Sequence, residues 1–147
     1  MLKGHCLCKG VQYEYHAELE QVAICHCNQC KQAQGTVFAT NAPIRAELFH
    51  ILKGEALLKS YFHSPNKRRV FCSHCASPIF SQVTTMPETI RLRLGTVTEG
   101  HIPPPAFEIF CDSKSNWLHL NADRPCYSQN INYCFRGFIL ADLGVYA

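Results

Sequence analysis

The chain has 147 residues and a formal net charge of +3, and it contains ten cysteines and eight histidines. This length is sufficient for one domain with its own hydrophobic core. No stretch approaches the roughly 20 consecutive apolar residues that a membrane-spanning helix needs, and the small net charge gives no electrostatic footprint for nucleic acid. The composition therefore excludes a transmembrane helix and argues against a nucleic-acid-binding protein.

Short segments with strand character run through most of the chain. Val11, Tyr13 and Tyr15 alternate with polar residues, which is the period-two pattern of a half-buried strand, and residues 89–94 repeat it. In chain order, strands are predicted over 11–15, 22–25, 36–40, 57–62, 69–71, 79–83, 89–94 and 107–111. The sequence therefore predicts a mainly β fold.

Helical signals are few. A turn or so of helix is predicted over 29–34, ended by Gly35, and another over 44–49. Three consecutive prolines at 103–105 cannot donate to a strand ladder, so we expect a loop that joins two strands there. The apolar C-terminal stretch, interrupted by Arg136 and Asp142, predicts an added edge strand or a subunit contact.

Seven of the ten cysteines form three clusters. The clusters are Cys6-x-Cys8, Cys25-x-Cys27-x-x-Cys30 and Cys72-x-x-Cys75. A structural zinc ion is held by four protein ligands, whereas a catalytic zinc ion typically has three and keeps one position open. Seven thiols therefore match two zinc ions, one in a closed site and one in an open site.

The number of thiols in each cluster decides how the clusters group. The first and third clusters each supply two thiols, and two such pairs from distant segments can close a tetrahedral site. The middle cluster supplies three from one tight turn. Combining the first two clusters instead would place five thiols on one ion and leave the third pair short. Seven thiolates and two zinc ions add −7 and +4 to the charge of +3, which brings the loaded protein close to neutrality.

A disulfide framework is the alternative to zinc. The chain opens directly into a cysteine cluster without the apolar stretch of a signal peptide, so we expect a cytoplasmic protein with reduced thiols. A bridge between cysteines two positions apart is also strained, because disulfides need Cα atoms roughly 4.4–6.8 Å apart and a defined torsion. Clustered cysteines in such a protein indicate metal binding.

The two histidines within the cysteine clusters and the three cysteines outside them are not predicted to bind metal. His26 and His74 each lie between two cysteines, where we expect partly exposed side chains that point away from the metal. Cys111, Cys126 and Cys134 have no ligand spacing and are predicted to be ordinary, unpaired thiols.

The cysteine motifs and their flanks resemble one known family. The matching segments are Gly4–Cys8, Cys25–Cys30 with Gly35 after it, Arg69–Cys75, Leu94-Gly95-Thr96, and Asp112 to Trp117 with its lysine and tryptophan. Over Lys3 to Tyr127 the chain resembles the glutathione-dependent formaldehyde-activating enzyme family, to which centromere protein V also belongs. The resemblance implies a β-tent fold of small antiparallel sheets organised around zinc in residues 1–127. Residues 128–147 would be an extension packed on the same domain or on a partner.

The resemblance also implies the ligand sets. Cys6, Cys8, Cys72 and Cys75 would hold the structural zinc ion, and Cys25, Cys27 and Cys30 the catalytic one. Members of the family usually carry glycine directly after each structural pair, where this chain has Lys9 and Ala76. A turn with positive φ costs a residue with a Cβ about 1–2 kcal/mol, and we expect Gly10 to adopt it in the first pair.

The implied activity is that of a carbon–sulfur lyase. An open zinc site lowers the pKa of a bound thiol, and the resulting thiolate attacks a small aldehyde held beside it. The expected partners are glutathione or another small thiol and formaldehyde or another small aldehyde, with no nucleic acid and no membrane; a homo-oligomer is left open. Lys31, Arg68 and Arg69 are candidates for the carboxylates of glutathione, whereas His26 is a candidate base by adjacency only.

Two other functions stay open at this point. Both zinc ions could be structural in a non-catalytic interaction module, in which case a protein group such as Cys111 or a histidine would fill the fourth position of the second site. Alternatively, the chain could carry glutathione without turning it over. Accelerated adduct formation separates an enzyme from a carrier.

Overall fold

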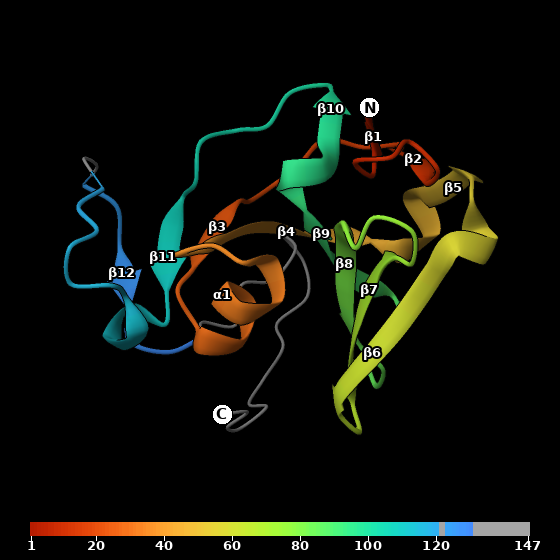
Figure 1. Ribbon diagram of the computed structural model, residues 1–147. Coiled ribbons are helices and arrows are strands. Elements are labelled where there is room, and N and C mark those ends of the chain that lie inside the picture. The colour runs from red at the N-terminus through yellow and green to blue at the C-terminus, as the bar shows by residue number, and fades with distance from the viewer. Residues whose placement is uncertain (121–122, 131–147) are drawn as a thin grey trace.

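The computed structural model describes residues 1–120 and 123–130, and these residues form a mainly β structure of two sheets with one short α-helix (Figure 1). Of the predicted C-terminal extension, 131–147 lie outside the described residues, as does Cys134. Within the described part of the chain, no helix has the length and hydrophobicity to cross a membrane.

The smaller sheet has four strands in the order β10-β1-β2-β5, all antiparallel. Its members are β1 (Leu2–His5), β2 (Gln12–Tyr15), β5 (Phe49–Lys53) and β10 (Val97–Glu99). Tyr13 and Tyr15 of β2 point into the core and are almost fully buried, as their alternation with polar residues predicts.

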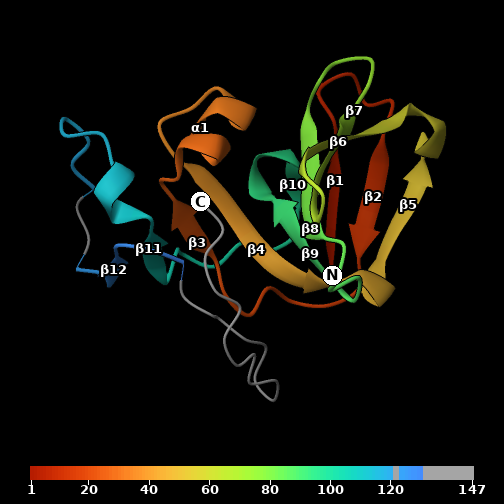
Figure 2. The ribbon, with the colours of Figure 1, turned by 90° about the horizontal axis from the view of Figure 1, so that it is seen from below.

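The larger sheet has eight strands in the order β12-β11-β3-β4-β9-β8-β7-β6. Its members are β3 (Ala23–Cys25), β4 (Ala39–Arg45), β6 (Leu58–Ser64), β7 (Lys67–Cys72), β8 (Pro78–Val83), β9 (Thr89–Arg93), β11 (Phe107–Ile109) and β12 (Cys126–Tyr127). Strand β11 pairs in parallel with both β3 and β12, and the other pairs are antiparallel. The expectation of small antiparallel sheets fits the four-stranded sheet but is wrong for the pairs that β11 makes in the larger one. Figure 2 shows the small sheet and β12 at opposite ends.

The helix α1 (Asn28–Gln34) lies directly after β3 and is fixed at both ends by local interactions. At its start the Cys27 side chain accepts a hydrogen bond from the Cys30 amide. At its end Gly35 adopts the left-handed conformation, with φ of 62°, and its N–H donates to the Lys31 carbonyl. The predicted turn of helix ended by Gly35 is thereby confirmed.

Short 3₁₀ turns take the place of the second predicted helix. Residues 44–49 contain the end of β4, the turn Ala46–Leu48 and the first residue of β5. Further turns lie at Glu55–Leu57, Leu94–Thr96 and Cys111–Ser113. The three consecutive prolines lie in the loop between β10 and β11, as predicted.

Two hydrophobic clusters form the core, and each contains one group of cysteines. The larger cluster packs the small sheet against β4, β8 and β9 and includes Cys6 and Cys72. The smaller cluster gathers residues of β3, β4 and β11 with Cys25 and Cys30. The cysteine groups are therefore part of the packing that holds the two halves of the fold.

Candidate metal centres

Four cysteines from two distant segments meet where the small sheet contacts the large one. Cys6 directly follows β1, and Cys72 ends β7; both are fully buried, whereas Cys8 is exposed and Cys75 half-buried. The four sulfur atoms all lie within 4.8 Å of one another, with Cys6 and Cys8 3.4 Å apart and Cys8 and Cys72 3.8 Å apart. Tetrahedral zinc–sulfur bonds of about 2.3 Å place sulfurs about 3.8 Å apart, so this donor set fits zinc.

The backbone around these pairs is folded as two tight turns. The amide of Lys9 donates to the Cys6 carbonyl, and the amide of Ala76 donates to the Cys72 carbonyl. Lys9 and Ala76 both have φ of 59°, so the residues after each pair adopt the strained conformation expected there. The expectation that Gly10 relieves this turn is wrong. The space around Gly10 is tight instead, because a Cβ there would lie 2.8 Å from Leu57 Cδ1 and 3.2 Å from the Cys8 sulfur.

A second group of three cysteines occupies the junction of β3 and α1. Cys25 ends β3, Cys27 caps the helix and Cys30 lies in its first turn, so a single local turn brings the three sulfurs within 4.8 Å of one another. Cys25 and Cys30 are buried and Cys27 is half-buried. Hydrogen bonds from Cys25 and Cys27 lower the pKa of the Cys30 thiol, and the charges of Arg93 and Arg69 favour its ionised form further. Three clustered cysteine sulfurs are a donor set that suits zinc.

Among the residues that the structure describes, this second group contains no fourth metal-ligating side chain. The sequence suggested Cys111 or a histidine for that position, and neither the Cys111 sulfur nor a histidine nitrogen of the described residues lies with the three sulfurs. Cys111 forms a disulfide, and His26 bonds to Glu108 through its Nε2 atom. The structure therefore brings together all seven predicted cysteines in the predicted four-plus-three grouping.

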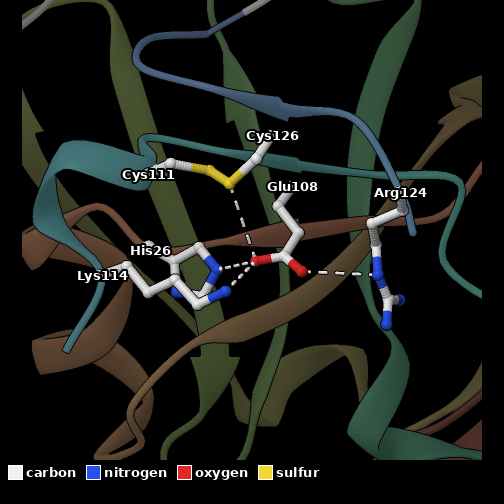
Figure 3. Close-up of a disulfide and its surroundings, with 6 residues drawn as sticks. All are labelled: His26, Glu108, Cys111, Lys114, Arg124 and Cys126. Atoms are coloured by element: carbon white, nitrogen blue, oxygen red, sulfur yellow. Dashed lines mark hydrogen bonds and ion pairs between the residues drawn. A yellow bond between two sulfur atoms is a disulfide. The ribbon is translucent and has the colours of Figure 1, made fainter. Parts of the chain in front are cut away.

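His26 is fully buried, which contradicts the expectation of a partly exposed side chain. Its Nε2 atom lies 2.8 Å from Glu108 Oε2, and Lys114 donates to the same oxygen at 2.9 Å (Figure 3). Arg124 Nε lies 3.4 Å from the other oxygen, Oε1. Burial by itself would raise the pKa of Glu108, but the hydrogen bonds from Lys114 and His26 outweigh it and lower the pKa. Glu108 thus anchors, through His26, the turn that carries Cys25 and Cys27.

Cys111 and Cys126 form a disulfide beside Glu108, so their prediction as unpaired thiols is wrong (Figure 3). Their Cα atoms are 6.1 Å apart, within the usual range. Although the two sulfurs and Glu108 also lie within 4.8 Å of one another, the covalent bond occupies the sulfurs. The bridge joins the turn after β11 to β12, and their separation of 15 residues carries no recognisable motif.

Reduction of this bridge is expected to destabilise the protein by about 3 kcal/mol, which is the chain-entropy value for a loop of about 15 residues. Urea unfolding with and without a phosphine reductant measures the difference. The Cys111→Ser/Cys126→Ser double variant is the control, because its stability should not respond to the reductant. Equal responses of the variant and the natural protein would contradict the assignment of the effect to this bridge.

Basic side chains near the three-cysteine group were only partly predictable. Arg93 stands at a polar position of the period-two pattern in residues 89–94, yet it is only 4% exposed and donates to Ser81 Oγ at 2.8 Å. Burial lowers the pKa of Arg93, and the negative charges of Cys30 and Cys25 act in the opposite direction. A buried cation therefore faces the thiol group. The spacing of residues in the sequence could not predict the roles of Arg93 and Glu108, because each side chain meets its partner only when distant strands pair.

Similarity to known proteins identifies the family of this chain. No curated protein matches the chain. Among solved structures, the chain is similar to a Rhodobacter sphaeroides protein determined as a structural genomics target, with 25% identity and a TM-score of 0.55 over 69% of this chain and 91% of that one. The family model described as "Glutathione-dependent formaldehyde-activating enzyme" matches residues 1–113, which include all seven clustered cysteines. The chain therefore belongs to the glutathione-dependent formaldehyde-activating enzyme family.

Proposed function

We propose that this protein is a zinc-dependent carbon–sulfur lyase that joins a thiol, glutathione in the first instance, to formaldehyde or another small aldehyde. Cys6, Cys8, Cys72 and Cys75 would hold a structural zinc ion, at the junction of the two sheets of a β-tent fold. Cys25, Cys27 and Cys30 would hold the catalytic one. Family membership supports the glutathione and formaldehyde chemistry.

The observation that carries the proposal is the contrast between the two cysteine groups. One group has four sulfurs and is complete as a tetrahedral site, whereas the other has three and no fourth ligand in the described part of the chain. Zinc on three thiolates would lower the pKa of an incoming thiol and present it as the nucleophilic thiolate.

The residues of the chain then have separate tasks. The three cysteines carry one more negative charge than zinc neutralises, and the buried guanidinium of Arg93 compensates part of that charge. His26, held by Glu108, fixes the turn between Cys25 and Cys27. In the synthetic direction the thiol gives up its proton and a carbon–sulfur bond forms to the aldehyde carbon. The π electrons of the carbonyl move to its oxygen, which takes up one proton in place of the one that the thiol released; cleavage is the reverse.

A non-catalytic interaction module is the main alternative. It requires a protein group in the fourth position of the second site. Cys111 is bound to Cys126, and no histidine nitrogen of the described residues lies with the three sulfurs, so neither Cys111 nor a described histidine supplies one. This favours the open site.

The zinc-loaded protein is expected to accelerate the equilibration of glutathione and formaldehyde with S-hydroxymethylglutathione, followed by NMR exchange. Cys27→Ser should reduce the rate to that of the uncatalysed reaction, because it removes a ligand of the open site. Asn28→Ala is the matched control: Asn28 is exposed in the same turn, is not a ligand and should leave the rate unchanged. Binding of glutathione without any acceleration would indicate a carrier and contradict the enzymatic proposal.

A further inference from the structure

The Cys111–Cys126 bridge is the one disulfide among the described residues, whereas all seven clustered cysteines of the same chain are free thiols. Disulfides are rare where glutathione keeps thiols reduced, and those that form there are usually transient or redox-sensing. A chain that keeps seven thiols reduced meets such an environment. The bridge is therefore suited to respond to thiols as well as to join two segments.

One end of the bridge is open to attack by a thiolate. Cys126 is exposed, whereas Cys111 is half-buried. The Cys126 sulfur lies 3.9 Å from Glu108 Oε2, so this carboxylate disfavours negative charge on that sulfur (Figure 3). Lys114 and Arg124 pair with Glu108 and offset its repulsion of an incoming anion. Because exchange depends on access to the attacked sulfur and on the stability of the leaving thiolate, we expect attack on Cys126 and departure of Cys111.

The bridge holds a short strand against the Glu108 carboxylate. Strand β12 has only two residues and lies at the edge of the larger sheet, where it pairs with β11. Just before it, the Pro125 carbonyl accepts a hydrogen bond from the Glu108 amide, and Arg124 forms an ion pair with the Glu108 side chain. So short a strand gains little from its ladder. Opening the bridge therefore frees β12 and takes two partners from Glu108.

Glu108 connects this segment to the three-cysteine group through a single side chain. Its Oε2 atom lies 2.8 Å from His26 Nε2, and the His26 amide donates to the Ile109 carbonyl at 3.0 Å. His26 is fully buried and stands between Cys25 and Cys27 in the chain. The placement of these two sulfurs therefore depends on how firmly β11 and Glu108 hold His26.

We propose that the Cys111–Cys126 bridge is a redox switch, which a small thiol such as glutathione opens and which sets how tightly the three-cysteine group retains zinc. The proposal rests on the proposed function only for the zinc ion at that group.

The exchange has two steps. A first thiolate forms a bond to the Cys126 sulfur, the bond between the two cysteine sulfurs breaks, and Cys111 leaves as a thiolate. A second thiolate attacks the sulfur of the first in this mixed disulfide and releases Cys126 as a thiolate. The protons that the two thiols gave up go to the two cysteines. Two thiols are thereby oxidised to one disulfide while the bridge is reduced.

Mass spectrometry of peptides tests the exchange, after the zinc-loaded protein has met millimolar glutathione and has been quenched with acid. Acid removes zinc and any thiol bound to it, so only covalent adducts remain. The bridge should open, with any trapped glutathione on Cys126. Glutathione trapped on Cys111, or a bridge that stays intact, would overturn the proposal.

Zinc retention is measured on the natural protein with and without a phosphine, which reduces the bridge without adding a competing thiol. A chromophoric chelator should remove zinc from the three-cysteine group roughly tenfold more readily after reduction, the lower end of the effect of groups that orient metal ligands. A Cys27→Ser protein identifies the release of the four-cysteine ion, which should not respond. The proposal fails if the three-cysteine ion does not respond either, or if both ions loosen equally.

Two variants provide the controls. Cys111→Ser/Cys126→Ser should release zinc as the reduced protein does and should ignore the phosphine; a response that persists there would overturn the assignment to this bridge. Arg124→Gln keeps the bridge but removes a cation beside Glu108, so it should shift the oxidised protein part of the way. Asp123→Asn, at an exposed neighbouring position, should not.

Failure of the proposed function gives a separate result. A protein that does not accelerate the reaction of glutathione with formaldehyde would still open the bridge and change its zinc retention, because neither measurement follows lyase activity.

Discussion

A Cys72→Ser variant is expected not to fold into a stable protein. Cys72 is fully buried at the end of β7, and its sulfur belongs to the group that joins this strand to the residues after β1. A structural zinc ion contributes on the order of 10 kcal/mol, which is comparable to the whole stability of a domain. On the proposed zinc assignment, loss of one ligand therefore removes most of the free energy that keeps the two sheets together. Circular dichroism and thermal unfolding would show the loss of a cooperative transition.

Ser73→Ala is the control for this experiment. Ser73 is exposed between Cys72 and Cys75, and its backbone amide, rather than its side chain, bonds to the Leu57 carbonyl. The variant should unfold at nearly the natural temperature. A cooperative Cys72→Ser protein with unchanged stability would show that the four sulfurs are not a structural metal site.

A Glu108→Gln variant is expected to lose about 3–5 kcal/mol of stability, the cost of breaking a buried ion pair. Glu108 is only 3% exposed and neutralises Lys114 and Arg124 while accepting from His26. The amide keeps the shape of the carboxylate but leaves the half-buried cations of Lys114 and Arg124 without their counter-charge. Denaturant unfolding of the two proteins at neutral pH measures the difference.

Glu99→Gln gives a matched comparison, because Glu99 lies 4.0 Å from Lys3 with both side chains exposed. Such surface pairs contribute less than about 1 kcal/mol. If the two glutamate variants lost the same small amount, the Glu108 network would not anchor the structure.

The same network predicts an acid-sensitive protein. The folded state lowers the pKa of Glu108 from its usual value of 4.5, so its contribution is fully present above that value. The contribution is lost as the pH falls through the lowered pKa of the folded state, where the carboxylate takes up a proton. Stability of Glu108→Gln should therefore vary less over this acidic range than that of the natural protein.

The strands were predictable where side chains alternate on one face. The segments 11–15 and 89–94 contain β2 and β9 because one face of each is buried against the core. Strand β4 was predicted as 36–40 but runs over Ala39–Arg45, through Asn41 and Pro43. Residues 39–41 pair with β3 and residues 41–45 pair with β9. Pro43 therefore lies beyond the part of the strand that pairs with β3. Pairing to distant strands, not local preference, sets its length.

The cysteine grouping was predictable because ligand counts depend only on the residues themselves. Interactions between distant segments were not. Glu108 reaches His26 across 82 positions because β11 pairs in parallel with β3, and Cys111 meets Cys126 because β12 pairs with β11. These are properties of topology, which no local pattern in this chain encodes.

Native mass spectrometry of the purified protein, without and with millimolar glutathione, tests the central claim most directly. The four-plus-three arrangement predicts two zinc ions per chain, a glutathione adduct, and a Cys27→Ser variant with one zinc ion and no adduct. One zinc ion or none in the natural protein, or two that persist in Cys27→Ser, would contradict the assignment of the three-cysteine group as an open zinc site.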